Sequence, residues 1–438
     1  MNGLGILFAL ITATLMFVLP RRWALVPLFM GAAYVTVGQV IEAGPFHFTI
    51  MRLLLAVGFL RVIVKRERIE GGLTGLDKIV ILWAVWAVVS SAFHNNLLVT
   101  MLGTAYSALG SYFLLRVFIQ TPEDFIRCAK ILIVLLVPVA GEMVLEKWAG
   151  KNAFAVFGYV TETVHVRNGK IRAQGAFSHS ILAGTVGAMV FPLAVLVWRN
   201  QRKLAWLGFG VAGVMVLASA SSGPVMTLMT IGAALACWRA RNMLRWICWS
   251  VVVALIALNF IMNDPVYFLL ARIDLAGGST GWYRAALIQS ALKHLGEWWM
   301  VGTDYTRHWM PSGVGWSPNH TDITNHYLQM GVWGGLPLMV LFIGIMYAGF
   351  SRLTKAWRME HNASFEQQFF IWTLGAILFG HATTLISICY FDQSELFLYL
   401  TFAGIAALRV TQPIAQPFAT GEEELTSAGY SHEPCTAP

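Results

Sequence analysis

Histidine and arginine residues gather in one polar stretch of this chain, between Asn263 and His326. Apolar runs flank the stretch on both sides, so the change in composition is sharp. Histidine can accept a proton near neutral pH, and arginine can hold phosphate oxygens through two parallel hydrogen bonds. The stretch therefore has side chains for proton transfer on a phosphate-bearing substrate. They are Arg272, Arg284, Asp304, Arg307, His308, His320, Asp322 and His326, with Trp282, Trp298, Trp299, Trp309 and Trp316 among them.

These residues also have structural alternatives. His320 could be an exposed loop residue, and His326 could cap the helix that follows it. Arg284 could form an ion pair with Glu297 or Asp304. The five tryptophans could stack on sugar rings, but tryptophan also gathers at membrane interfaces. From residue types alone, a functional role and a structural role both remain open for each of these residues.

The elements that must position these side chains are membrane-spanning helices. The 438 residues are 57% hydrophobic and 12% charged, whereas a soluble domain carries about 25% charged residues. Apolar runs of membrane-spanning length predict an all-α, polytopic membrane protein with about 12–13 transmembrane helices over residues 1–410. The first run is expected to be a retained span, since no small-residue cleavage site follows it. The runs lie near 4–20, 23–41, 49–64, 78–93, 97–119, 129–147, 176–198, 204–220, 224–238, 246–262, 327–350, 368–389 and 395–409.

Basic residues predict the orientation of these spans. Short basic groups separate apolar runs near residues 21, 65, 199–203, 239–245 and 352–358, and such groups mark cytoplasmic loops. Two larger loops, at about 148–175 and 263–326, then lie outside, and the tail 411–438 is predicted to be disordered in the cytoplasm. The formal charge of +8 reflects this topology, so no nucleic-acid partner is expected. Cations that remain in the outer loops favour an anionic ligand.

Several classes of function are disfavoured by the sequence. The chain contains no Gly-rich phosphate loop and no recognisable soluble catalytic domain, so an ATP-driven pump is not expected. Its five cysteines are scattered without a metal-binding spacing. No metal-ligand cluster is visible, and a metal-free mechanism without cofactors is expected.

The end of the large loop carries the most specific motif. His320 is followed by Thr321, nine residues, Gly331, two residues and Gly334, directly at an apolar run. This spacing resembles the superfamily of bacterial O-antigen ligases and O-antigen or exopolysaccharide polymerases, although Thr321 stands where the family has Asn, Ser or Gln. The segments around Arg172 and Arg284 resemble two further family segments. A third family segment, Ser-Arg-Gly, reads Ser221-Ser222-Gly223 here, so its arginine is missing.

The resemblance implies a glycosyltransferase of the bacterial inner membrane. Such enzymes move a glycan from undecaprenyl pyrophosphate to an acceptor glycan on the outer face, beside membrane lipid and other polysaccharide assembly proteins. It implies a catalytic pair, His320 as base and Arg284, with Arg172, Arg284 and Arg272 on the pyrophosphate. For Arg272, pairing with a neighbouring aspartate is the favoured alternative. His326, Asp322 and Arg307 are possible secondary residues.

Three activities remain open at this stage. A polymerase is favoured over a ligase that transfers the glycan to lipid A core, because the Ser-Arg-Gly arginine is missing. A transporter or flippase for lipid-linked oligosaccharide would share the same span count. Transporters more often place polar sites near the membrane midplane and show internal repeats, whereas here the polar residues concentrate in one outer loop. The concentration favours an enzyme.

Overall fold

The computed structural model describes residues 1–95, 97–272, 280–360 and 364–408. The tail 411–438, predicted to be disordered, lies outside the described residues. The α-helices are α1 (Gly3–Val18), α2 (Val26–Tyr34), α3 (Ile50–Val64), α4 (Gly75–Ser91), α5 (Leu98–Phe118), α6 (Pro122–Ala149), α7 (Ser180–Val197), α8 (Arg202–Ala218), α9 (Ser222–Ala236), α10 (Leu244–Ile261), α11 (Gly281–Lys293), α12 (Leu295–Trp298), α13 (His326–Met359), α14 (Phe365–Thr384) and α15 (Glu395–Ala406).

Short 3-10 helices and strands connect them. The 3-10 helices are η1 (Arg21–Trp23), η2 (Ala153–Phe157), η3 (Cys237–Met243), η4 (Val266–Arg272), η5 (Arg307–Trp309) and η6 (Asp392–Ser394). Two antiparallel hairpins pair β1 (Val40–Ala43) with β2 (Phe46–Thr49), and β3 (His165–Arg167) with β4 (Lys170–Arg172).

The predominantly helical fold predicted from the apolar runs is confirmed. By length and composition, five helical segments of the described chain are suited to crossing a membrane: Leu98–Phe118, Pro122–Ala149, Ser180–Val197, Ser222–Ile261 and His326–Met359. The helices α1 and α15 are apolar but shorter. Helix starts follow local chemistry: Thr74, Thr121 and Ser364 each form a capping box with the residue three positions later.

The structure differs locally from the predicted helices and loops in two places. The apolar run at 23–41 is not one helix, because α2 ends at Tyr34 and the chain continues extended into β1. The residues after Tyr34 include the β-branched Val35, Thr36 and Val37, which favour extended backbone over helix. The second place is the predicted outer loop at 148–175, which contains η2 and the β3–β4 hairpin.

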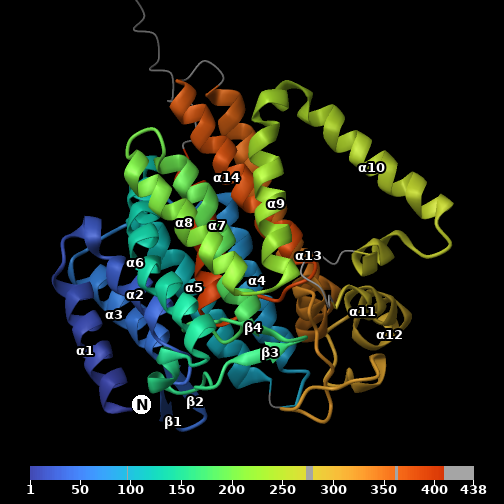
Figure 1. Cartoon of the computed structure of the whole chain (residues 1–438), viewed down its shortest axis with the longest axis horizontal. Coiled ribbons are helices and arrows are strands. Elements are labelled where there is room, and N and C mark those ends of the chain that lie inside the picture. The colour runs from blue at the N-terminus through green and yellow to red at the C-terminus, as the bar shows by residue number, and fades with distance from the viewer. Residues whose placement is uncertain (96, 273–279, 361–363, 409–438) are drawn as a thin grey trace, which may run out of the picture.

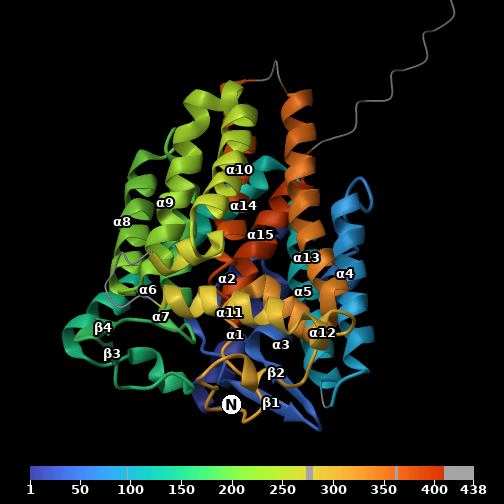
Figure 2. The same ribbon diagram turned by 90° about the vertical axis from the view of Figure 1, so that its right-hand side faces the viewer.

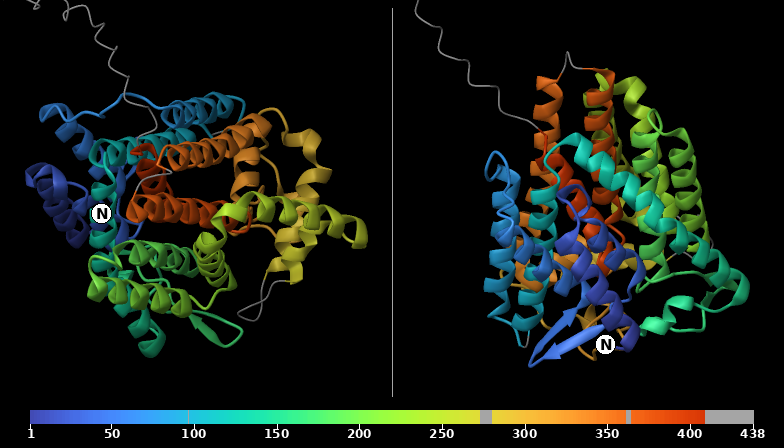
Figure 3. Two further views of the ribbon diagram at one scale, coloured as in Figure 1. Left: turned by 90° about the horizontal axis from the view of Figure 1, so that it is seen from above. Right: turned by 90° about the vertical axis from the view of Figure 1, so that its left-hand side faces the viewer.

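The polar regions of the chain gather at one end of the helical bundle. Figures 1 and 2 show β1–β2, β3–β4, α11 and α12 at the same end as the N-terminus, while the C-terminal end of α13 lies at the opposite end. In the view from above, α14 and α15 lie between the green helices α7–α9 and the blue to teal N-terminal helices (Figure 3). Their contacts with α9, α7 and α5 agree with this placement. The two segments predicted as outer loops therefore share one face.

Residues 280–326 form a folded cap within the stretch where the sequence predicted a loop. Its helices α11 and α12 enclose a small separate core that includes Leu287, Trp298, Trp309 and Val332 of α13. Two of the five tryptophans are thus buried core residues, and Trp282, Trp299 and Trp316 are exposed. The cap is attached to the bundle through α13, so its side chains have defined positions.

Candidate functional site

Arg172 ends strand β4 on a loop that a buried carboxylate holds in place. Glu146 of α6, which is 1% exposed, accepts hydrogen bonds from the backbone N–H groups of Gln174 at 3.0 Å and Gly175 at 2.9 Å. Gly175 has a φ of +57°, a conformation that glycine adopts without strain. Helix α6 therefore fixes the turn that directly follows Arg172.

The Arg172 guanidinium is buried, and its charge is not neutralised by a described acidic side chain. Its Nη2 donates to the hydroxyl of Ser221, at the start of α9, whereas its Nε has no hydrogen-bond partner. Burial, and then the charges of Arg167 and Arg284, lower the pKa of Arg172. Ser221 belongs to the segment where the family resemblance expects an arginine, so that segment does contact the arginine cluster, through a serine.

Arg284 lies on the first turn of α11 and faces the same region. Its Nε is also buried without a partner. Burial, and then Arg167, lower the pKa of Arg284, and the charge of Asp322 opposes them. The neighbouring Tyr283 hydroxyl lies 3.0 Å from both Thr321 Oγ1 and the carbonyl oxygen of Asp322. The first turn of α11 is therefore hydrogen-bonded to residues 321–322, which directly follow His320.

The structural partners considered for Arg284 are engaged elsewhere. Glu297 accepts hydrogen bonds from Trp309 and contacts His308, while the Asp304 carboxylate bonds to His94 Nδ1 at 2.7 Å. Asp322 is the acidic group whose charge acts on Arg284. Burial raises the pKa of Asp322 and Arg284 lowers it, although the side chain remains in contact with solvent.

A buried arginine elsewhere in the chain, Arg61, has a full set of hydrogen-bond partners and serves as a comparison. Arg61 of α3 is 1% exposed, and all three of its guanidinium nitrogens are bonded. It forms two hydrogen bonds with the Glu67 carboxylate, at 3.0 and 3.2 Å, and its Nη1 donates to two backbone carbonyls at 2.6 Å. Buried polar groups normally find such partners. Arg172 and Arg284 depart from this rule together, so the pair has the donors and the charge to hold an anion.

His179 belongs to this region and was not identified from the sequence. Its Nδ1 accepts the backbone N–H of Ile181 at the start of α7. Desolvation, and then the charges of Arg172, His165 and Arg167, lower the pKa of His179 to about 4, although part of the ring is exposed. His179 is therefore neutral at neutral pH. Its sequence neighbours form an ordinary span start, so only the folded structure associates it with the arginines.

His320 lies beside this region on the cap. Its Nδ1 is 2.7 Å from Ser317 Oγ, and its ring stacks on the exposed Trp316 with centroids 5.4 Å apart at an angle of 27°. Burial lowers the pKa of His320 and the charge of Asp304 raises it. The imidazole is thus neutral near pH 7, as a proton acceptor must be. Trp316 adds an exposed aromatic face next to it.

The other sequence candidates lie apart from the arginine pair. Arg272 is exposed at the end of η4, and no described contact joins it to Arg172 or Arg284. Arg307 donates to the carbonyls of Met310 at 2.8 Å and of Pro311 at 3.1 Å, which holds its own loop together. His326 is 5% exposed at the first position of α13, with its ring against Phe342 and its Nδ1 without a partner.

His320 also makes no described contact with Arg172 or Arg284. The link between them is indirect, since residues 321 and 322 contact Tyr283, the neighbour of Arg284. The structure thus brings Arg172, Arg284 and Asp322 into one charged region and places His320 on the adjoining segment.

The motif glycines position this segment through close packing. A Cβ at Gly331 would lie 2.6 Å from the Trp298 ring, and one at Gly334 would lie 2.7 Å from Ser90 Oγ. At Gly335, with a φ of +74°, α13 departs from helical geometry, and Leu336 donates its N–H to the Trp299 carbonyl at 2.8 Å. The glycine spacing therefore lets the cap approach the α13 backbone directly.

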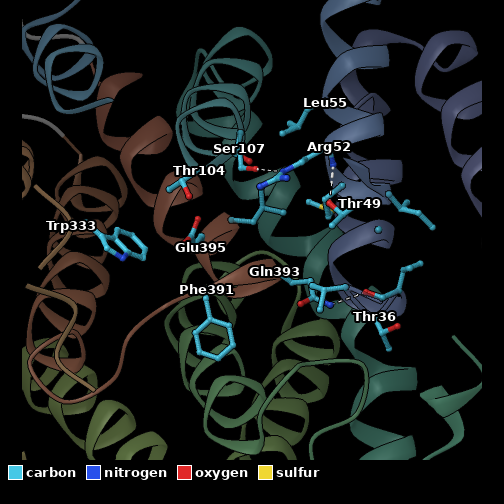
Figure 4. A pocket seen from close by; sticks show the side chains of 17 residues that line it. Thr36, Thr49, Arg52, Leu55, Thr104, Ser107, Trp333, Phe391, Gln393 and Glu395 are labelled. Carbon is cyan, nitrogen blue, oxygen red and sulfur yellow. Dashed lines mark hydrogen bonds between the residues drawn. The ribbon is translucent and has the colours of Figure 1, made fainter. Parts of the chain in front are cut away.

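A cavity of about 200 Å³ lies between α3, α5, α13 and the start of α15. Figure 4 shows Arg52, Thr104, Ser107, Gln393 and Glu395 around it, with Arg52 Nε donating to Ser107 Oγ at 3.0 Å. The Gln393 amide, also in the wall, donates to the Ala176 carbonyl at 3.2 Å and so reaches the turn that holds Arg172. The sequence did not associate these residues with the outer-loop arginines.

No family model, no curated protein and no solved structure matches this chain. Any assignment of function therefore depends on the residues and geometry described above.

Proposed function

We propose that this protein is a multi-pass glycosyltransferase of the bacterial inner membrane that polymerises undecaprenyl-pyrophosphate-linked oligosaccharide repeat units. The products would be an exopolysaccharide or O-antigen chain, formed on the outer face of the membrane. In this proposal about 12–13 helices cross the membrane, and the end with the hairpins, α11 and α12 faces outward. The basic turns at the opposite end fit this orientation.

The observation that carries the proposal is the pair of buried, unpartnered guanidinium Nε atoms on Arg172 and Arg284. Burial, and then the charges of Arg167 and Arg284, lower the pKa of Arg172, and no described acidic side chain pairs with it. A pyrophosphate would supply both the missing acceptors and the missing negative charge. Arginine is suited to this because its planar fork matches two phosphate oxygens.

The reaction follows from these positions. The acceptor hydroxyl oxygen attacks the anomeric carbon of the donor glycan, and the carbon–oxygen bond to the pyrophosphate breaks. The electron pair of that bond leaves with the lipid pyrophosphate, whose growing charge Arg172 and Arg284 stabilise. The hydroxyl proton passes to neutral His320. Trp316, stacked on His320 and exposed, offers a face for the acceptor sugar.

The acceptor distinguishes the proposed polymerase from a ligase. A polymerase uses the end of a second lipid-linked repeat unit, whereas a ligase uses a sugar of the lipid A core. The arginine expected from the resemblance is replaced by Ser222, and its absence favours the polymerase. The neighbouring Ser221 contacts Arg172 directly. A flippase would leave both the acceptor and the role of His320 unexplained.

The test is glycan analysis in a bacterial host from which this gene is deleted. Loss of a polymerase leaves single repeat units on the carrier or lipid, and the wild-type gene restores long chains. Undecorated lipid A core beside finished polymer would indicate a ligase, and intermediates trapped on the inner face would indicate a flippase. Complementation with His320→Ala or Arg284→Ala is expected to leave single units while the protein inserts normally. Full-length polysaccharide from both variants would refute the assignment.

A further inference from the structure

Three side chains of the cap form a cluster that the sequence did not reveal. His294, at the junction of α11 and α12, Glu297 of α12 and His308 of η5 bring their potential ligand atoms within 4.8 Å of one another. His294 is half-buried, and the other two are exposed, so ions in solution can reach all three. The spacing of three and then eleven residues matches no common metal motif, which is why the sequence predicted none.

The cluster is already ordered as a ligand set. His294 Nδ1 lies 2.8 Å from the backbone carbonyl of Ser290, which places its proton on Nδ1 and leaves the Nε2 lone pair free to bind. Metal-binding histidines usually have such a second hydrogen bond, because it fixes the tautomer and the ring orientation. Trp309 Nε1 donates to Glu297 Oε2 at 3.2 Å and orients the carboxylate in the same way.

His308 completes the arrangement. Its Nε2 lies 3.0 Å from Glu297 Oε2, and its ring stacks on Tyr305 with centroids 5.0 Å apart. The rings of His294 and His308 are nearly perpendicular, with centroids 4.8 Å apart. Two imidazoles and one carboxylate thus bring one potential ligand atom each into a single cluster.

We propose that His294, Glu297 and His308 bind a divalent transition-metal ion of the zinc type. Two imidazole nitrogens favour zinc, copper or nickel over magnesium and calcium, which prefer oxygen ligands. Two histidines and one glutamate, with water in the fourth position, form a known zinc ligand set. Small side-chain rotations bring the ligand atoms from their present separations to bonding distance.

The ion would connect the two parts of the cap that carry the candidate site. His294 follows Arg284 by ten residues, or about 15 Å along the helix axis at 1.5 Å per residue. His308 precedes His320 on the segment that returns to α13. The metal would therefore brace α11 against η5 without touching the arginine pair, and its binding does not depend on the proposed glycosyl transfer.

The test uses the full-length protein, purified in detergent with an affinity tag that contains no histidine. After chelator treatment, Co²⁺ is added and its visible d–d absorption is followed, then Zn²⁺ is titrated by calorimetry. One ion per chain is expected, with a rise in the unfolding midpoint. His294→Ala and the near-isosteric Glu297→Gln are expected to weaken binding by about 100-fold or more, since loss even of supporting groups costs 10- to 100-fold.

A matched control distinguishes a site from general surface affinity. His47 and Glu42 form an exposed histidine–carboxylate pair at 4.0 Å on the β1–β2 hairpin, with no third ligand described beside them. His47→Ala is expected to bind the metal like the wild type. Equal binding by wild type and the His294→Ala, His308→Ala double variant would overturn the proposal, as would the absence of binding at micromolar Zn²⁺. Variants whose metal-free unfolding midpoints equal that of the wild type show that lost binding is not lost folding.

Discussion

Replacing Arg172 by methionine tests whether this arginine binds substrate or stabilises the fold. Methionine is shorter, equally unbranched along its aliphatic part and uncharged, so the change removes the unpartnered Nε and the repulsion from Arg167 and Arg284. A buried donor without a partner costs about 1–3 kcal/mol. The lost hydrogen bond to Ser221 is worth about 1.5–3 kcal/mol, since one partner is charged. The two effects offset each other, and the free energy of unfolding should stay within about 1–2 kcal/mol of the wild type.

Arg61→Met supplies the contrast. Its guanidinium has a carboxylate partner, Glu67, and two backbone carbonyls, so methionine leaves a nearly buried carboxylate unpaired. Breaking a buried ion pair in this way costs about 3–5 kcal/mol. Arg61→Met should therefore lower the unfolding midpoint clearly, whereas Arg172→Met should not.

The rate of polymer formation, in contrast to stability, should respond strongly to Arg172→Met. A charge-assisted hydrogen bond to the departing pyrophosphate is worth about 1.5–3 kcal/mol, and each 1.36 kcal/mol is a factor of ten in rate. Arg172→Met should therefore slow polymer formation by about 10- to 150-fold. Arg199→Gln, at an exposed ion pair with Glu366, controls for the loss of a positive charge alone and should leave the rate unchanged.

The assay combines thermal unfolding in detergent with glycan transfer in membranes. Inorganic pyrophosphate serves as the probe ligand, because a ligand bound only by the folded state raises its stability. It should raise the midpoint of the wild type and of Arg199→Gln, but not of Arg172→Met. Arg172→Met as unstable as Arg61→Met, with the pyrophosphate response retained, would refute the reasoning.

Three further predictions concern the cap. Asp304→Asn removes the charge that raises the pKa of His320. The pKa of His320 should therefore fall further, and the acid limb of the pH–rate profile should move to lower pH. An unchanged acid limb would argue against His320 as the base. Gly335→Ala should destabilise by about 1–3 kcal/mol, because its Cβ would lie 2.3 Å from a backbone oxygen at a φ of +74°, whereas Gly210→Ala, with open space around it, should not shift the unfolding midpoint. Tyr283→Phe should slow transfer while pyrophosphate still stabilises the protein, because it detaches residues 321–322 from α11 without altering the arginines.

The sequence predicted the helices well because each apolar run has a physical reason to be helical. Backbone groups in a membrane must bond within their own segment, so long apolar runs leave few alternatives. The exception at 23–41 arose because apolar content alone does not separate helix from strand in β-branched stretches. The same limit hid the β1–β2 and β3–β4 hairpins, whose strands have only three or four residues.

The candidate site was predictable only in part. The spacing of His320, Gly331 and Gly334 singled out this segment as a motif, and both glycines face side chains that leave no room for a Cβ. The nearness of Arg172 and Arg284 follows from how α6 and α11 are placed, which no local pattern contains. His179 was missed for the same reason, and so was the cluster of His294, Glu297 and His308.

Buried charged side chains at the two ends of the bundle differ in how they are paired. At the turn after α3 the protein satisfies the buried cation Arg61 completely, with contacts from α1 and from Glu67. At the opposite end Glu146 is also satisfied, but it binds backbone N–H groups of the 174–175 turn and does not pair with Arg172. Glu146 thus fixes the position of the loop, and the unpaired charge of Arg172 is the one that the proposed pyrophosphate would neutralise.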